Sequence, residues 1–386
     1  MAGDPPGPSR RGAIPPFQVM EVMRAADARA RAGGEVFHLE VGQPSTGAPR
    51  GVIEAAASAM ANDVLGYTLA LGVEALRDAI SGHYRDAYGI DIPARRIVVT
   101  TGASGAFMLA FLAAFEAGDR VAMALPGYPG YRHILNALGN RVVTIQAGAA
   151  SRYQPSVALL EQLDQPISGL IVASPSNPAG AMIPRDEFAR LVDYCERHGI
   201  RMVSDEIYHG ITYGEKAVTA AAFSENTVVI NSFSKYFSMT GWRLGWMVAP
   251  EDLLRSIESL AQNLFISPPT LSQLAAIAAF DCHEELQANV ERYAANRALL
   301  LEALPKAGFG TLAPADGAFY IYADVSHMSN DSQEFCRRML AETGVAATSG
   351  VDFDPQRGNA YVRFSFSGST EDMAEAAMRL REWRRC

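Results

Sequence analysis

Several features are scarce or absent in this chain of 386 residues, and each absence excludes a class of protein. The four cysteines lie at least 50 residues apart, which leaves no CxxC motif and gives no support to a disulfide framework. The seven histidines include no HExxH pair, so we expect no metal site. The longest uninterrupted apolar run spans residues 106–115. A membrane-spanning helix needs about 20 apolar residues, so we expect no membrane segment.

Positive charge is also in deficit. The chain has 33 basic and 42 acidic residues, a net charge of −9, whereas nucleic-acid binding more often comes with a basic surface. We therefore expect no nucleic-acid partner. Residues 1–13 are rich in proline and glycine without an apolar stretch, which predicts a flexible arm and not a signal peptide. With no export signal and no paired cysteines, a cytoplasmic location is the simplest expectation.

The hydrophobic share of 49% is that of a folded protein, and the chain is long enough for two domains. From residue 97 to 248, short β-branched runs alternate with helical patterns, which predicts an α/β, doubly wound and mainly parallel sheet. After residue 250 the pattern indicates a smaller α+β unit. We predict a large domain over residues 46–285 and a small domain over 286–386, with residues 14–45 packing against the small domain.

The segment with the strongest chemical signal surrounds Lys235. It reads Ser-Phe-Ser-Lys over residues 232–235, directly after a predicted strand, and Arg243 follows eight residues later. Burial near a second cation lowers the pKa of a lysine, and a free amine can form an imine with an aldehyde. The hydroxyls of Ser232 and Ser234 with the Arg243 guanidinium can together hold a phosphate.

Polar residues follow two neighbouring strands and open one helix. Asp205 and Tyr208 follow the predicted strand 201–204, where a carboxylate could pair with a cationic ring nitrogen and a phenol with a ring oxygen. Asn177 follows the strand 169–173, and taken alone its segment is equally typical of a proline turn. The small residues of 101–105 precede a helix, whose N-terminus favours an anion.

One arginine lies in a late strand. Arg363 alternates with Val362 and Phe364 over residues 361–367, so it lies on the face opposite these apolar side chains. It is either an exposed edge charge or a guanidinium that awaits the carboxylate of a substrate.

Taken together, these segments resemble the fold-type-I, pyridoxal-phosphate-dependent aminotransferases of class I/II. Asn177, Asp205, Tyr208, Lys235 and Arg243 occur in the order and at the spacings of that family, with an arginine near the C-terminus. The segment 39–44, Leu-Glu-Val-Gly-Gln-Pro, resembles the family's substrate loop. The segment that starts at residue 67 resembles the part that one subunit lends to the site of its partner.

The resemblance implies pyridoxal 5′-phosphate as cofactor, amino acids and 2-oxo acids as substrates, and a homodimer with shared sites. It implies catalytic roles for Lys235, Asp205 and Tyr208. Lys235 would carry the cofactor and move the proton, Asp205 would keep the ring nitrogen protonated, and Tyr208 would bond the phenolic oxygen. The other implied cofactor-binding residues are Gly102, Ala103, Ser104, Tyr128, Asn177, Ser232, Ser234, Arg243 and the partner's Tyr67. The implied substrate-binding residues are Gly42, Asn177 and Arg363.

The substrate prediction depends on Ser104. Aspartate-specific prokaryotic relatives often carry a lysine at the position that Ser104 resembles, so we predict neutral amino donors, with Ile14 and Phe17 as candidate apolar contacts. Arg24 or Arg132 could supply a cation instead, which leaves aspartate aminotransferase as an alternative. A carbon–sulfur β-lyase would use the same residues and is the second alternative. A cofactor-binding regulatory module is a third, disfavoured because it usually carries an added DNA-binding domain.

Overall fold

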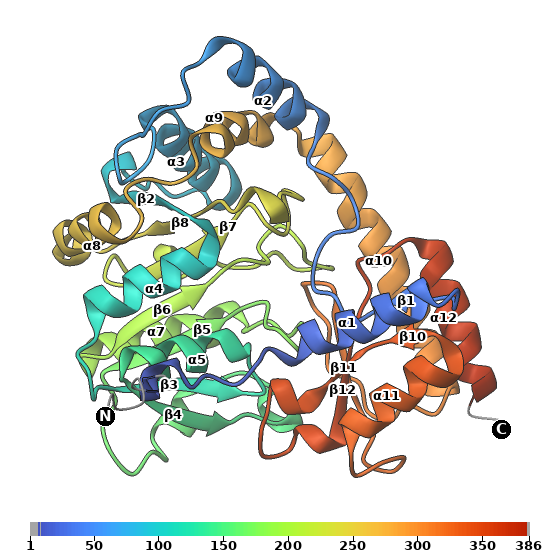
Figure 1. The fold of residues 1–386 in the computed structure, drawn as a ribbon. Helices are drawn as coiled ribbons and strands as arrows, with labels where there is room; N and C mark the ends of the chain where they lie inside the picture. The colour runs from blue at the N-terminus through green and yellow to red at the C-terminus, as the bar shows by residue number, and fades with distance from the viewer. Residues whose placement is uncertain (1–6, 8, 384–386) are drawn as a thin grey trace, which may run out of the picture.

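A seven-stranded sheet forms the centre of the larger part of the molecule in the computed structural model, which describes residues 7 and 9–383 (Figure 1). Its strand order is β2-β8-β7-β6-β5-β3-β4, and all neighbours are parallel except β8, which is antiparallel to β2 and β7. The predicted mainly parallel sheet is therefore confirmed. The strands are β2 Ile97–Thr100, β3 Arg120–Leu125, β4 Arg141–Gln146, β5 Gly169–Ala173, β6 Arg201–Asp205, β7 Val228–Ser232 and β8 Gly245–Val248.

Helices cover both faces of this sheet, because the strands carry apolar side chains on both. In β2, Val98 packs into one hydrophobic cluster with residues of α4, α5 and α8, whereas its neighbour Val99 packs into another with α2, α3, α7 and α9. The helices are α2 Arg50–Asn62, α3 Glu74–Tyr88, α4 Gly102–Ala114, α5 Pro129–Leu138, α6 Val157–Leu160, α7 Arg185–Arg197, α8 Glu251–Leu264 and α9 Thr270–Ile277. Among the described residues, no helix combines the length and the apolar character needed to cross a membrane.

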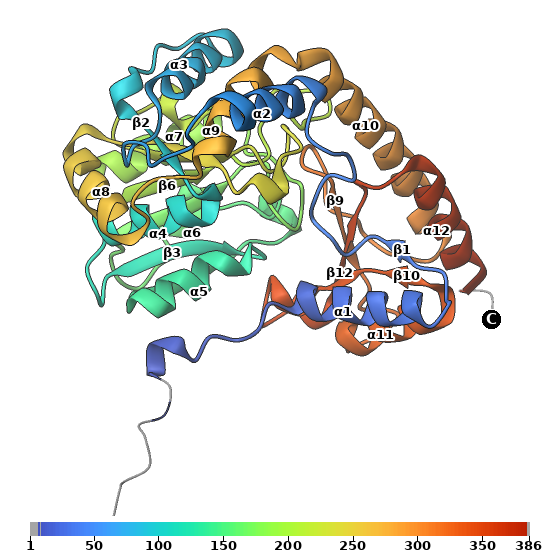
Figure 2. The ribbon, with the colours of Figure 1, turned by 45° about the horizontal axis from the view of Figure 1, so that its top comes forward.

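A smaller unit is built on the antiparallel sheet β11-β12-β9 and the short parallel pair β1-β10. Figure 2 shows α1 alongside α11 in this unit, and Ala26 of α1 packs with Leu340 of α11 and Ala346 of β10. The elements are α1 Gln18–Arg31, β1 Phe37–His38, α10 His283–Lys306, β9 Tyr320–Asp324, α11 Ser332–Thr343, β10 Val345–Ala346, β11 Thr348–Ser349, β12 Tyr361–Ser365 and α12 Thr370–Trp383. The long helix α10 runs from the larger part into this unit (Figure 1).

The structure corrects one helical prediction. The pattern over 272–304 indicates a single helix, but α9 ends at Ile277, and the 3-10 turn Ala278–Asp281 separates it from α10. The domain limits stay a proposal, which is supported by the pairing of Phe37 with Val345. Of the predicted arm 1–13, residues 1–6 and 8 lie outside the described residues.

Candidate active site

A cavity of about 430 Å³ lies at the carboxyl ends of β5, β6 and β7. Asn177 follows β5, Asp205 ends β6, and Lys235 comes three residues after β7. Parallel strands end at the same edge of a sheet, so these side chains meet although the sequence separates them. Most of the predicted site residues line this cavity: Gly42, Ala103, Ser104, Tyr128, Asn177, Asp205, Tyr208, Ser234, Lys235, Arg243 and Arg363.

Lys235 presents its amine to the cavity. Its Nζ donates a hydrogen bond to the backbone oxygen of Gly42, in the loop that follows β1. Burial lowers the pKa of Lys235 to about 8, and the nearby Arg363 and Arg243 cations act in the same direction. With this pKa, roughly one amine in ten is neutral at pH 7, and the neutral amine is the form that attacks a carbonyl carbon.

Asp205 is buried at the floor of the cavity. The Tyr131 hydroxyl donates to its Oδ2, and the Ile207 backbone N–H donates to its Oδ1 at 3.0 Å. Burial raises the pKa of Asp205 to about 6, although the two hydrogen bonds and the Lys235 charge act against this. The hydrogen bond from Tyr131 to Asp205 was not predicted. The position of Tyr131 three residues after Tyr128 at the start of α5 is a signal that could have found it, since residues three apart share a helix face.

Arg243, Ser234 and the first turn of α4 line part of the cavity, and we call this group the anion cradle. The first turn of α4 begins at Gly102, whose φ of +71° suits glycine, and a Cβ there would lie 2.5 Å from Nη2 of Arg243. Glycine thus allows the guanidinium to approach the helix N-terminus, and Ser234 lines the same cavity. Ser232 does not line it: its hydroxyl donates to the Leu244 backbone oxygen at 3.2 Å and accepts from the Ser234 N–H at 3.0 Å. Its contact with a phosphate stays a prediction.

Arg363 lines the same cavity and is buried, so it is not an exposed edge charge. Its Nη1 donates to Asn177 Oδ1 at 3.0 Å and its Nη2 to the Glu40 backbone oxygen, while Nε has no partner. The guanidinium lies over the rings of Tyr320 and Phe353, 4.4 and 4.8 Å from their centroids. The Nε–H is therefore a buried donor without a protein acceptor, and an arginine N–H of this kind suits a carboxylate.

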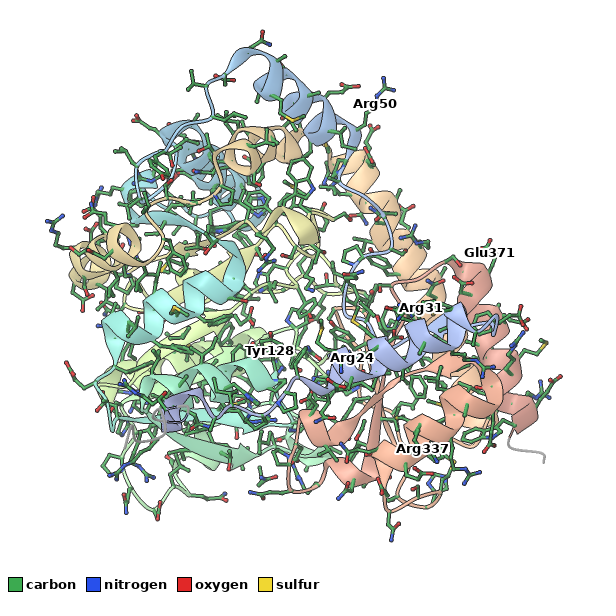
Figure 3. All side chains as sticks on the ribbon, in the orientation of Figure 1. Arg24, Arg31, Arg50, Tyr128, Arg337 and Glu371 are labelled. Atoms are coloured by element: carbon green, nitrogen blue, oxygen red, sulfur yellow. The ribbon has the colours of Figure 1, made fainter. Side chains whose placement is uncertain are left out.

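Aromatic side chains also line the cavity. Tyr128 lies at the end of α5 that faces α1 (Figure 3), and its ring meets that of Phe17 edge to face at 5.9 Å. The Tyr208 hydroxyl lies 2.8 Å from the hydroxyl of Tyr320, a contact that the sequence did not predict. A tyrosine in an apolar strand such as β9 is typical of a core, so no sequence signal marks Tyr320.

Tyr67 lies away from the cavity of its own chain. Its side chain is 84% exposed, and Val64 and Leu69 in the same loop are also exposed, at 99% and 78%. A cluster of exposed large apolar side chains is typical of an interaction surface.

Known proteins are similar to this chain along nearly its whole length. Residues 34–380 match the family described as aminotransferase class I and II. The chain is 50% identical to valine–pyruvate aminotransferase of Mycobacterium tuberculosis, over 97% of each chain, and 31% identical to aspartate/prephenate aminotransferase of Thermus thermophilus, also over 97% of each. Among solved structures, an aminotransferase from Mycobacterium tuberculosis superposes with a TM-score of 0.97 at 48% identity, covering 99% of this chain and 100% of that one.

Proposed function

The chain belongs to the class I and II aminotransferases and is a pyridoxal-phosphate-dependent transaminase, and on this premise we propose that Lys235, Asp205 and Arg363 carry the reaction on a neutral amino donor. The observation that carries the proposal is that these three side chains line one cavity together with the residues of the anion cradle. The relatives named above are aminotransferases, which supports amino transfer over the carbon–sulfur lyase alternative.

The donor set of the cavity fits pyridoxal 5′-phosphate. Arg243, Ser234 and the first turn of α4 would hold the phosphate, because a helix N-terminus and a guanidinium both favour an anion. Asp205, as a carboxylate, would accept a hydrogen bond from the protonated ring nitrogen, and Lys235 would form the covalent bond. Tyr128 would cover one face of the ring. When bound, this cofactor supplies an electron sink that accepts the electron pair of the Cα–H bond of the substrate.

The chain's own residues position the substrate and move its proton. Arg363 and Asn177 would bind the α-carboxylate, and the free Nε of Arg363 leaves a donor for it. The Lys235 amine, with its lowered pKa, would take the proton from Cα. Asp205 at the cavity floor would stay ionised next to a cationic ring, because an opposite charge lowers the pKa of a buried carboxyl group.

The walls of the cavity favour an uncharged substrate side chain. Among its described lining residues, the cations are Lys235, Arg243 and Arg363, which already have roles. Of the other candidate cations, Arg24 pairs with Glu21 on the surface and Arg132 donates to the Asp352 backbone oxygen. The N-terminal segment instead contributes apolar side chains to the lining: Phe17, Val19 and Met20.

We expect neutral amino acids to exceed aspartate and glutamate as donors by about tenfold or more in kcat/KM. An apolar side chain gains about 1.5–3 kcal/mol on burial, whereas a carboxylate that loses water without a partner costs several kcal/mol. The measurement is kcat/KM for alanine, valine, leucine, phenylalanine, aspartate and glutamate, with pyruvate and 2-oxoglutarate as acceptors. Ser104→Lys should raise the relative rate for aspartate, and Ser104→Met, of similar length but uncharged, should not. If aspartate leads in the wild type, the interpretation of Ser104 is wrong.

We also propose a cytoplasmic homodimer in which each subunit completes the partner's site through Tyr67. The exposed loop of Val64, Tyr67 and Leu69 supports this proposal, because exposed apolar side chains of this kind are typically buried against a partner. Two-fold dimers are the commonest homo-oligomers.

Mixing two inactive variants should restore activity if sites are shared. Refolding Tyr67→Ala with Lys235→Ala in equal amounts should give about a quarter of wild-type activity, because half of the dimers are hybrids and each hybrid has one intact site. The control is each variant refolded alone, which must stay inactive. Sedimentation of the wild type reports the oligomer directly, and a fully active monomer would contradict the proposal.

A further inference from the structure

Tyr320 lines the cavity, where it contacts Tyr208, Arg363 and the loop at Gly42. It starts β9, is almost fully buried, and pairs in register with Ser365 of β12. Its hydroxyl lies 2.8 Å from that of Tyr208, and its ring lies against the guanidinium of Arg363. Its hydroxyl also touches the loop at Gly42, where a Cβ would lie 2.1 Å away.

A simple core role does not account for this hydroxyl. Tyr322 lies two residues along the same strand, is equally buried, and its hydroxyl has no hydrogen-bond partner. The Tyr320 hydroxyl, in contrast, has Tyr208 as its partner, and either oxygen can be the donor in this pair. Burial raises the pKa of both phenols, so each keeps its proton over the working pH range.

Each tyrosine hydroxyl has one proton and can donate one hydrogen bond, which decides whether Tyr208 or Tyr320 is the donor in their contact. If Tyr208 donates its hydrogen bond to the phenolic oxygen of the cofactor, its proton is not available to Tyr320. The hydrogen bond between the two tyrosines then requires Tyr320 to be the donor. We propose that Tyr320 is a positioning residue that donates to Tyr208 and thereby strengthens the hydrogen bond from Tyr208 to the cofactor. Successive hydrogen bonds polarise one another in this way. The inference rests on the proposed placement of Tyr208.

The expected effect can be read from the cofactor's own colour. A hydrogen bond to the ring oxygen would draw electron density from it, so Nζ of Lys235, bonded to the cofactor beside that oxygen, would hold its proton less tightly. Removing the Tyr320 hydroxyl should therefore raise the apparent pKa of the visible absorption band. We expect Tyr320→Phe to raise this apparent pKa by about half a pH unit, because the lost neutral hydrogen bond acts on the cofactor only through Tyr208. Tyr208→Phe should raise it further.

The test is a pH titration of the visible band in the cofactor-loaded wild type and four variants. These are Tyr208→Phe, Tyr320→Phe, the double variant and Tyr322→Phe, and each keeps its aromatic ring. The double variant should match Tyr208→Phe, because Tyr320 acts only through Tyr208. Tyr322→Phe, the matched control from the same strand, should titrate like the wild type.

Three results would overturn the proposal. An unchanged pKa of the band in Tyr208→Phe would show that Tyr208 does not bond the ring oxygen. The proposed action of Tyr320 through Tyr208 would then also be wrong. A shift of this pKa in Tyr208→Phe but none in Tyr320→Phe would overturn the role of Tyr320 alone and leave the proposed function intact. Equal shifts in Tyr320→Phe and Tyr322→Phe would mean that any hydroxyl lost from β9 disturbs the site.

Discussion

Lys235→Ala should abolish covalent attachment of the cofactor and reduce kcat/KM by at least the order of 10²–10⁴-fold that a positioned proton-transfer group supplies. The physical reason is that the alanine removes both the amine that bonds the cofactor and the group that moves the Cα proton. The measurements are the visible spectrum, steady-state kinetics, and borohydride reduction followed by peptide mapping. The label should lie on the peptide that contains Lys235.

The chain offers simple controls for this experiment. Its other two lysines are Lys216 and Lys306, both exposed, and Lys306 forms a surface ion pair with Glu302. Lys216→Ala and Lys306→Ala should keep the wild-type spectrum and rate. A reduced label on either of these lysines, or a Lys235→Ala variant with normal turnover, would refute the assignment.

Asp205→Ala should retain the cofactor but lose turnover by on the order of 10²–10³-fold, the usual effect of removing a preorganised group that stabilises developing charge. The Lys235 bond and the anion cradle are untouched, so binding should persist. The buried carboxylate, in contrast, is the anionic side chain among the described lining residues of the cavity. The measurement is single-turnover loss of the Cα proton with a deuterated amino donor.

A second variant separates the charge of Asp205 from its structural contacts. Asp205→Asn keeps an oxygen that can accept from the Ile207 N–H, as Oδ1 does now. It should lose nearly as much activity as the alanine variant while melting close to the wild type. Near-normal deprotonation in either variant would exclude Asp205 from the mechanism.

Much of the fold could be predicted because the buried strands are continuous apolar runs. The strand at 169–173 has the predicted bounds. The helices α1, α2 and α3 were not predicted, because no strands frame them as they do in the βα repeat. The break between α9 and α10 was also missed. Its sequence, Ala-Ala-Phe-Asp, is compatible with a helix, so packing and not local preference ends α9 at Ile277.

The site was predictable where chemistry follows a strand end. Lys235 and Asp205 could be chosen on that ground, and both line the cavity, while their catalytic roles remain proposals. Contacts between residues far apart could not be predicted. The backbone oxygen of Glu40, which accepts from Arg363, has no signature because every residue carries one. The hydroxyl pair of Tyr208 and Tyr320 depends on how β9 approaches the end of β6.

The hydrogen bond between Arg363 and Glu40 joins residues that are 323 positions apart, and this has a consequence for synthesis on the ribosome. The cradle that would hold the phosphate uses residues up to Arg243, whereas the carboxylate fork requires the strand that contains Arg363. Chains emerge N-terminus first, so the cradle can form while the last third is still being translated. On the proposed assignment, one chain would therefore complete its own phosphate-binding residues before its carboxylate-binding residues.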